Sequence, residues 1–265
     1  MKNFKFNKIQ VIESLPNNEK SGTDLFNDII SRKKDFFYPK LKTELSNPST
    51  KKEFIECLNK IKNNLIENGI CPIIHFEIHG SNDKKGLILS SGEFLSWKEL
   101  VIYISEINLL TRNNLFITFA VCYGANFLKE IKINEPSPYW GFIGSFKELT
   151  FEDLTIRYEE FYNEFLISLD LTKSISRLHN SNPSIPSSYE FINSEMTFNT
   201  IYEKYYNEQF SNEKIKERAL ETAIETGIIF NTKNEEQDYI ERFKKELLKT
   251  KDKYRKEDEK IFLMK

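Results

Sequence analysis

The chain has 265 residues and a nearly balanced charge, with 38 Lys and Arg against 40 Asp and Glu and a formal net charge of −2. This balance argues against an electrostatic nucleic-acid binder, which would show a basic excess, so we expect no direct nucleic-acid binding. Hydrophobic residues make up 39% and charged residues 29%, as in globular proteins with a charge-rich surface, and the length allows one large domain or two small ones.

Secretion and membrane signals are missing from the sequence. The start, MKNFKFNKIQ, has no apolar run of signal-peptide length, and no stretch approaches the ~18 apolar residues of a membrane span. The three cysteines, Cys57, Cys71 and Cys122, are widely spaced and fit neither a zinc pattern nor a disulfide framework. We therefore expect a cytoplasmic protein with no metal, no cofactor and no membrane contact.

Strand and helix patterns alternate over the first 180 residues. The expected strands cover residues 8–15, 72–80, 114–122 and 139–146, with a hairpin at 86–97. The expected helices cover residues 23–34, 49–67, 96–109 and 151–169. The run NLFITFAVC (114–122) is uniformly apolar, as in a central strand buried on both faces of a parallel sheet. The alternation predicts an α/β fold, a three-layer α/β/α sandwich around a mostly parallel central sheet.

The character of the chain changes after Asn180. SNPSIPSS predicts a loop, YEFINSEM one more strand, and nearly everything from Thr197 onward a helix. We therefore expect a first domain over residues 1–196 and a helical C-terminal extension over 197–265, packed on the first domain or regulating it. The last helix is either a solvated cap or a docking surface for a partner, because its charged surface includes an apolar seam. The seam consists of Tyr239, Phe243, Leu247 and Tyr254.

Two of the expected strands end in chemically reactive residues. One ends in His79-Gly80 and the other in Cys122-Tyr123-Gly124, with His79 and Cys122 separated by 122 − 79 = 43 residues. A right-handed crossover of this length places two parallel strands side by side or nearly so, ~4.8 Å apart when adjacent. Because ligands collect outside the carboxyl ends of such strands, we expect His79 and Cys122 to meet there.

A histidine beside a cysteine has a definite chemistry. The thiolate is the nucleophile, and an imidazole can take the thiol proton and later protonate a leaving amine. The backbone N–H groups of Gly80 and Cys122 would form an oxyanion hole, and Gly124 would permit a sharp turn that presents the thiol. The alternative, an inert core cysteine and a hydrogen-bonded core histidine, remains open on these residues alone.

The segments HFEIHG, GLILSSGEFLSW and NLFITFAVCYGA, followed by YWGFIGSF and YEEFYNEFLISLDL, resemble the caspase-like cysteine peptidases of clan CD. The resemblance is to the bacterial CHAT branch, covers about residues 8–180, and is most specific at the His-Gly and Cys positions. It implies a caspase-like fold, His79 as general base and acid, Cys122 as nucleophile and Gly80 in the oxyanion hole. It also implies a P1 pocket walled by Glu13, Ser14, Ser145, Lys147 and Glu148.

Two features depart from that family. Glu77 and Ile78 stand where the family carries small residues, often including glycine. Glu77 shares a strand face with His75 and His79, so it would either orient His79 or pair with a basic residue elsewhere, and we expect His75 to be a structural, hydrogen-bonded histidine. Ala120 occupies the place of a caspase glutamine that helps hold an acidic P1 side chain, so strict Asp specificity is not expected.

We therefore expect a cysteine endopeptidase acting on a protein substrate. The resemblance implies a role in bacterial antiviral defence or regulated cell death, with activity switched on by a partner protein or a signalling small molecule. The main alternative is a catalytically silent caspase-fold binding or scaffold module. A third reading, a doubly wound nucleotide-binding domain, is disfavoured because SLPNNEKSG stands where a glycine-rich phosphate loop would follow the first strand.

Overall fold

The computed structural model describes residues 4–265, so residues 1–3 of the expected first domain lie outside the described residues. The chain divides into two compact units. Unit 1 comprises the residues up to Lys132 together with Ser137–Ser194, and unit 2 comprises Ile133–Pro136 together with Glu195–Lys265.

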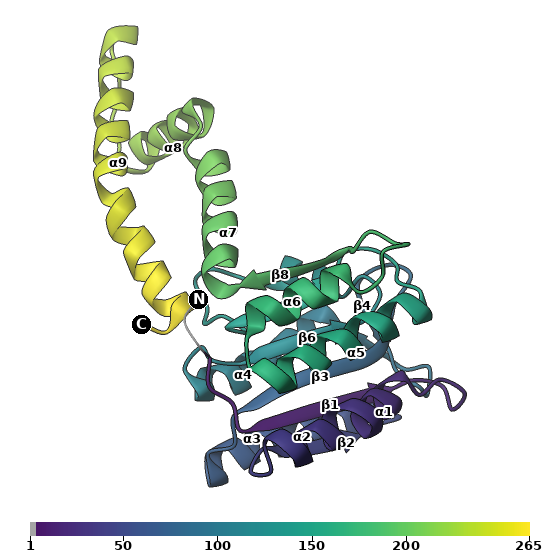
Figure 1. The fold of residues 1–265 in the computed structure, drawn as a ribbon. Coiled ribbons are helices and arrows are strands. Elements are labelled where there is room, and N and C mark those ends of the chain that lie inside the picture. Colours follow the sequence, from purple (N-terminus) through teal and green to yellow (C-terminus); the bar gives the residue numbers. More distant parts are fainter. Residues whose placement is uncertain (1–3) are drawn as a thin grey trace. The chain divides into compact units, whose positions relative to one another are not determined.

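Unit 1 is a three-layer α/β/α sandwich with a mostly parallel sheet, as the sequence predicts (Figure 1). The sheet order is β2-β1-β3-β6-β7-β8, in which β8 alone is antiparallel to its neighbour. Its strands are β1 (Lys8–Ser14), β2 (Lys42–Ser46), β3 (Pro72–Gly80), β6 (Phe116–Ala120), β7 (Gly141–Ser145) and β8 (Tyr189–Asn193). The hairpin of β4 (Gly86–Ile88) and β5 (Phe94–Ser96) pairs with the end of β3.

Helices cover both faces of this sheet (Figure 1). On one face α3 (Lys51–Asn68) and α4 (Trp97–Thr111) pack together. On the other face α5 (Phe151–Ser168) packs against α6 (Leu171–Asn180) and against the N-terminal helical segment. That segment consists of α1 (Ser21–Asp24), a π-helical stretch (Leu25–Ser31) and α2 (Arg32–Phe37), and a 3₁₀ helix (Gly124–Glu130) follows β6.

The helices on the first face begin at well-defined caps. Thr50 and Glu53 form a capping box at the start of α3, and Ser96 and Glu99 form another at the start of α4. Gly69 ends α3 with a left-handed backbone, at a φ of 61° that a side chain would disfavour. In chain order α3 lies between β2 and β3, and α4 lies between β5 and β6. The β4–β5 hairpin and α4 thus connect β3 to β6, which lie side by side in the sheet.

Successive side chains of β3 point alternately to the two faces of the sheet, and so to the two helical layers. Phe76 lies on the α3 side, with ring centroids 6.0 Å from Phe54 and 5.1 Å from Phe119. His75 points the other way and contacts Tyr158 and Tyr162 of α5 at 4.8 and 5.4 Å. The same alternation directs Glu77 and His79 toward the α5 side of the sheet.

A buried arginine fixes the second helical layer. Arg157 of α5 is fully buried, and its Nε donates to both oxygens of Asp153 at 2.8 and 2.9 Å. Its remaining donors reach the carbonyl oxygens of Leu178, His179 and Ile185. The hydrogen bonds to these three carbonyls tie α5 to the end of α6 and to the following loop, and Asp153 on the same helix balances the buried charge of Arg157.

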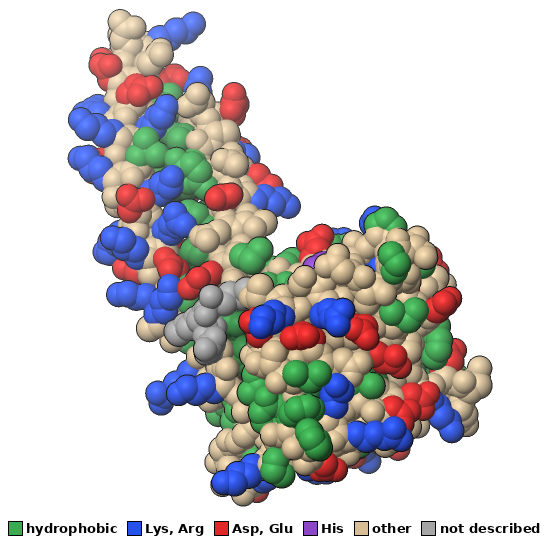
Figure 2. Space-filling view, viewed as in Figure 1, with side chains coloured by type: hydrophobic (Ala, Val, Ile, Leu, Met, Phe, Trp, Pro, Cys, Tyr) green, Lys and Arg blue, Asp and Glu red, His purple; other side chains and the backbone are tan. Residues whose placement is uncertain are grey.

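Unit 2 is helical. It contains α7 (Ser194–Gln209) from Glu195 onward, α8 (Asn212–Glu225) and α9 (Lys233–Leu263). Phe198 and Phe262 are buried with ring centroids 5.8 Å apart, whereas Figure 2 shows Lys, Arg, Asp and Glu side chains interspersed along the visible face of the helices. Of the helices in residues 4–265, none combines the length and the apolar character needed to cross a membrane.

Candidate active site

The register of β3 and β6 brings the two reactive strand ends together. Glu77 pairs with Ala120 in the last printed step of the parallel register, so His79 and Cys122 each lie two residues beyond that pair. Residues two apart on a strand share a face, and β6 itself ends at Ala120, just before the thiol. The expected adjacency of the two strands is confirmed.

Gly80 lies against the backbone of Cys122. A Cβ at Gly80 would stand 1.8 Å from the carbonyl oxygen of Cys122 and 2.8 Å from its carbonyl carbon. No other residue type can accept that approach without moving one of the two segments. The glycine after His79 is therefore a steric requirement of the contact between the two strand ends.

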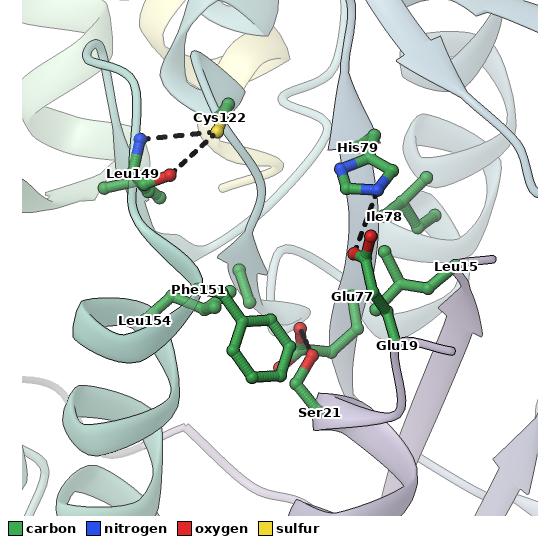
Figure 3. Close-up of a pocket in the computed structure, with 11 residues that line it drawn as sticks. Leu15, Glu19, Ser21, Glu77, Ile78, His79, Cys122, Leu149, Phe151 and Leu154 are labelled. Atoms are coloured by element: carbon green, nitrogen blue, oxygen red, sulfur yellow. Dashed lines mark hydrogen bonds and ion pairs between the residues drawn. The ribbon is translucent and has the colours of Figure 1, made fainter. Parts of the chain in front are cut away.

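A small cavity of about 70 Å³ opens between these strand ends (Figure 3). It is built from the ends of β1, β3 and β6, the start of α1 and the segment entering α5. Its lining consists of Leu15, Glu19, Ser21, Glu77, Ile78, His79, Ala120, Cys122, Leu149, Phe151 and Leu154. His79 and Cys122 thus face the same cavity.

The imidazole of His79 is held by a carboxylate that the sequence analysis did not single out. His79 Nε2 lies 3.1 Å from Oε2 of Glu19, and both side chains are partly exposed. Figure 3 shows the other ring nitrogen on the side facing Cys122. Glu19 belongs to the loop that follows β1. Functional residues of parallel sheets lie near the carboxyl ends of the strands, so the sequence indicates this loop as a candidate. It does not indicate which residue of the loop contacts His79.

The thiol of Cys122 is bonded to the backbone of Leu149. Its Sγ accepts a hydrogen bond from the Leu149 N–H at 3.3 Å, and the thiol donates to the Leu149 carbonyl at 3.5 Å (Figure 3). Burial raises the pKa of the Cys122 thiol, the Leu149 N–H opposes that rise, and the charge of Glu148 adds to it. The sulfur therefore carries its proton at neutral pH in this arrangement, which matches its role as a donor.

The turn after Cys122 differs from the expectation. The left-handed residue is Tyr123, with a φ of 60°, and not Gly124. Gly124 is needed for packing, since a Cβ there would lie 3.1 Å from Phe119 and 3.3 Å from Val121. The role expected for Gly124 as the residue that permits the sharp turn is thus corrected.

Glu77 is buried at the base of the cavity, and its carboxylate bonds to Ser21 and His75, whereas His79 pairs with Glu19. Ser21 Oγ donates to Oε2 of Glu77 at 2.8 Å, and His75 Nε2 lies 3.0 Å from its Oε1. His75 Nδ1 lies 2.7 Å from Thr118 Oγ1, which in turn lies 3.0 Å from Tyr162 Oη. The expectation that His75 is a structural, hydrogen-bonded residue is confirmed, and the partner of Glu77 is this histidine on its own strand.

The residues expected to wall a P1 pocket are absent from the cavity lining that the described chain forms. They are Glu13, Ser14, Ser145, Lys147 and Glu148. Glu13 accepts hydrogen bonds from Thr23 of α1 and from Asn47, and Ser14 donates to the Pro48 carbonyl at 2.6 Å, so these side chains are directed to α1 and to the segment after β2. Ser145 Oγ lies 2.8 Å from Ser188 Oγ.

Lys147 and Glu148 do not line the cavity, but both bond to Tyr123 in the turn that follows Cys122. The Lys147 carbonyl accepts a hydrogen bond from the Tyr123 N–H at 3.0 Å, and Glu148 accepts one from the Tyr123 hydroxyl at 3.3 Å. Together with the bonds between Leu149 and Cys122, these contacts fasten the segment before α5 to the turn that carries the thiol.

The sequence matches no protein-family model and no curated protein. Among solved structures, a secreted C11 cysteine protease from Bacteroides thetaiotaomicron, in complex with an irreversible peptide inhibitor, aligns with a TM-score of 0.45 and 13% identity. The alignment covers 74% of this chain and 68% of that chain. Identity at this level leaves the roles of individual residues to the geometry of this chain. No cluster of three or more His, Cys, Asp or Glu side chains suited to a metal ion occurs in residues 4–265.

Proposed function

We propose that this chain is a cysteine endopeptidase in which Cys122 is the nucleophile and His79 the general base and acid. The observation that carries the proposal is that His79 and Cys122, each two residues beyond the Glu77–Ala120 pair of the adjacent strands β3 and β6, line one cavity. A thiol and an imidazole on adjacent strand ends, both facing a cavity, suit acyl transfer.

The proposed reaction follows from these groups. His79 takes the thiol proton, and the thiolate attacks the scissile carbonyl carbon. The N–H groups of Gly80 and Cys122 stabilise the resulting oxyanion, and His79 then protonates the leaving amine as the C–N bond breaks. Water hydrolyses the acyl-enzyme with His79 again acting as base. Glu19 is a positioning residue in this scheme, since it holds Nε2 of His79 and leaves the other nitrogen toward Cys122.

The narrower assignment is to a caspase-like peptidase of the CHAT branch, with a domain of residues 1–196 and a regulatory helical extension of residues 197–265. The His-Gly and Cys motifs support it. The bonds between Cys122 and Leu149 support latency, because the thiol must leave Leu149 before His79 can take its proton. We propose that a partner protein or a signalling small molecule causes that change, in a bacterial defence or cell-death pathway.

A catalytically silent binding module is the second candidate. The same two bonds at Leu149 favour it, as does the raised pKa of the thiol, because both describe a cysteine that is not poised as a nucleophile. The two candidates differ in one measurable property, which is whether the reactivity of Cys122 depends on His79.

The test uses the other two cysteines of the same molecule as internal references. Cys57 and Cys71 are also partly buried, and burial raises the pKa of both. The protein is treated with a cell-permeable electrophilic peptide probe inside cells, under conditions that include the activating signal, and labelling at each cysteine is followed by peptide mass spectrometry. The proposal predicts that Cys122 is labelled faster than Cys57 and Cys71. The labelling rate of Cys122 should fall about 100-fold in His79→Ala and about tenfold in Glu19→Gln, and the rates of Cys57 and Cys71 should not change.

Glu106→Gln is the matched control for Glu19→Gln, because Glu106 pairs with Lys62 at 2.8 Å on α4, on the other face of the sheet. Labelling of Cys122 that is no faster than that of Cys57 and Cys71, and is indifferent to His79→Ala, would support the silent module instead.

A further inference from the structure

Glu13 is buried at the end of β1, beside its register partner Glu77 on β3, and it bonds to two other segments of the chain. Its Oε1 accepts a hydrogen bond from the backbone N–H of Thr23 in α1 at 2.9 Å. Its Oε2 accepts bonds from the Thr23 hydroxyl and, at 2.8 Å, from Nδ2 of Asn47, which follows β2. A buried carboxylate holds such donors firmly, because losing one of them leaves a buried polar group unpaired.

The bond between Glu13 and Thr23 takes the place of a helix cap. Lys20 is the N-cap residue of α1, and its side chain makes no capping hydrogen bond. A Ser, Thr, Asp or Asn at this position would accept a bond from the N–H of the second or third helical residue. Here the third residue, Thr23, donates its N–H to Glu13. A carboxylate of β1 therefore fixes the start of α1.

Gly22 packs closely between the two carboxylates at the strand ends. A Cβ at this position would lie 2.8 Å from Cγ of Glu77 and 3.0 Å from Oε1 of Glu13. The preceding residue, Ser21, donates its hydroxyl to Oε2 of Glu77 at 2.8 Å (Figure 3). The start of α1 is thus pressed directly onto the ends of β1 and β3.

Glu19 lies in the loop of residues 15–20, which ends at this anchored helix start. Its backbone N–H donates to the Pro16 carbonyl at 2.8 Å. Its carboxylate reaches His79 as a partly exposed pair, with the side chains of His79 and Glu19 48% and 32% exposed. Such a pair maintains its own geometry weakly, because water screens it and both side chains lose freedom in forming it. The contact therefore depends on the backbone that carries Glu19.

We infer that Glu13 is a positioning residue of the proposed reaction: it fixes the start of α1 and so holds Glu19 against His79. The inference rests on the proposed peptidase function. Glu13 lies outside the cavity lining, so its effect on the reaction passes through Glu19. A merely structural role would lower stability without making the effect of Glu13 depend on Glu19.

The test is a double-mutant cycle of Glu13→Gln and Glu19→Gln, followed as labelling of Cys122 by the same probe in cells that receive the activating signal. Glu13→Gln alone should slow labelling about fivefold, and it should cause no further loss in the Glu19→Gln protein, because both changes release the same imidazole. The loss should affect the limiting rate at high probe concentration. The probe concentration that gives half of this rate should not change, because the probe does not contact Glu13.

Two further positions serve as controls. Glu44→Gln is the matched variant, because Glu44 bonds to Lys8 at the start of β1 and to Lys60 of α3, and its loss should leave the labelling of Cys122 unchanged. Thr23→Ser keeps the hydroxyl donor to Glu13 and should be labelled like the wild type, whereas Thr23→Val should be slower by about twofold. Thermal melting of the purified variants confirms that each is folded.

Two results overturn the inference and leave the peptidase proposal intact. One is wild-type labelling rates in both Glu13→Gln and Thr23→Val. The other is an equal loss from Glu13→Gln in the presence and absence of Glu19→Gln. Labelling of Cys122 that is indifferent to His79→Ala in the otherwise unchanged protein contradicts the peptidase proposal instead.

Hydrogen–deuterium exchange measures the anchor without catalysis. In the purified protein, the backbone amides of residues 17–23 should exchange at least about threefold faster in Glu13→Gln than in the wild type, because the start of α1 opens more often. The same amides should exchange at the wild-type rate in Glu44→Gln. Unchanged exchange in Glu13→Gln would show that Glu13 does not hold this segment, and the inference would fail.

Discussion

Burial, the Leu149 N–H and the charge of Glu148 act on the pKa of the Cys122 thiol in opposing directions. Burial raises the pKa, the Leu149 N–H lowers it through a 3.3 Å hydrogen bond, and the nearby charge of Glu148 raises it again. A raised pKa means a smaller thiolate fraction at neutral pH. The resting rate of alkylation is therefore expected to be lower than that of a free cysteine.

Glu148→Gln isolates the smallest of these effects. Removing the charge lowers the thiol pKa, so alkylation by iodoacetamide at pH 7.5 should become about twofold faster, a modest change because Glu148 is exposed and screened by solvent. The difference should shrink with added salt and vanish at a pH where the thiol is fully ionised. A pH profile of alkylation measures this, and a slower or unchanged rate at pH 7.5 would contradict the assignment.

Individual residues differ in how far the sequence could predict them. His79 and Cys122 follow apolar strands, and that position alone marked them as candidates. Glu19 lies 60 residues from His79 in a loop of mixed polar residues, and nothing local distinguishes it from its neighbours. Glu77 departs from the family pattern, which the sequence shows. Its hydrogen-bond partners, Ser21 and His75, could not be predicted because they depend on the direction of its side chain.

At the level of elements, two tyrosines lie where α5 packs on the sheet, and only one of their hydroxyl groups has a hydrogen-bond partner among the described residues. Tyr158 of α5 donates to the Phe119 carbonyl at 2.8 Å. The hydroxyl of Tyr189 on β8 is buried without a hydrogen-bond partner among the described residues. Their ring centroids lie 5.3 Å apart, and burial raises the pKa of both well above the usual range, so both hydroxyl groups stay protonated.

Tyr189→Phe should therefore leave the free energy of unfolding unchanged or raise it by about 1 kcal/mol, because it removes an unsatisfied polar group. Tyr158→Phe should lower it by about 1–2 kcal/mol, because it takes the donor from a buried carbonyl. Chemical denaturation of both variants against the wild type tests the pair. A larger loss for Tyr189→Phe than for Tyr158→Phe would show that the hydroxyl of Tyr189 is bonded in solution.

The elements that the sequence predicted best are those with unbroken apolar patterns. β3 and β6 are buried on both faces, so their runs are unambiguous, and α3 repeats its buried residues at helical spacing. β2 (KTELS) was missed because an edge strand with one neighbour needs few apolar residues. α6 was missed because it buries only Ser174 and Leu178 and starts just two residues beyond the left-handed end of α5 at Leu169.

For the whole molecule, the cavity and all its described lining belong to unit 1, between Leu15 and Leu154. Unit 2 supplies none of these side chains. Its longest helix, α9, has a high density of both charge signs, which Figure 2 shows on its visible face, and partly buried rings such as Tyr239 and Phe243, with centroids 6.5 Å apart. The sequence predicted the helices of this region. Of the expected seam of the last helix, Tyr239, Phe243 and Leu247 are partly buried, whereas Tyr254 is 57% exposed. The sequence left open whether the seam is a cap or a docking surface, since either use buries the same residues.

The central claim is that Cys122 and His79 cleave peptide bonds. The most direct measurement expresses the wild type, Cys122→Ala and His79→Ala in the same cells under conditions that include the activating signal, and maps protein N-termini by mass spectrometry. The account predicts new N-termini that occur with the wild type alone. Identical sets of N-termini in all three cultures would contradict it.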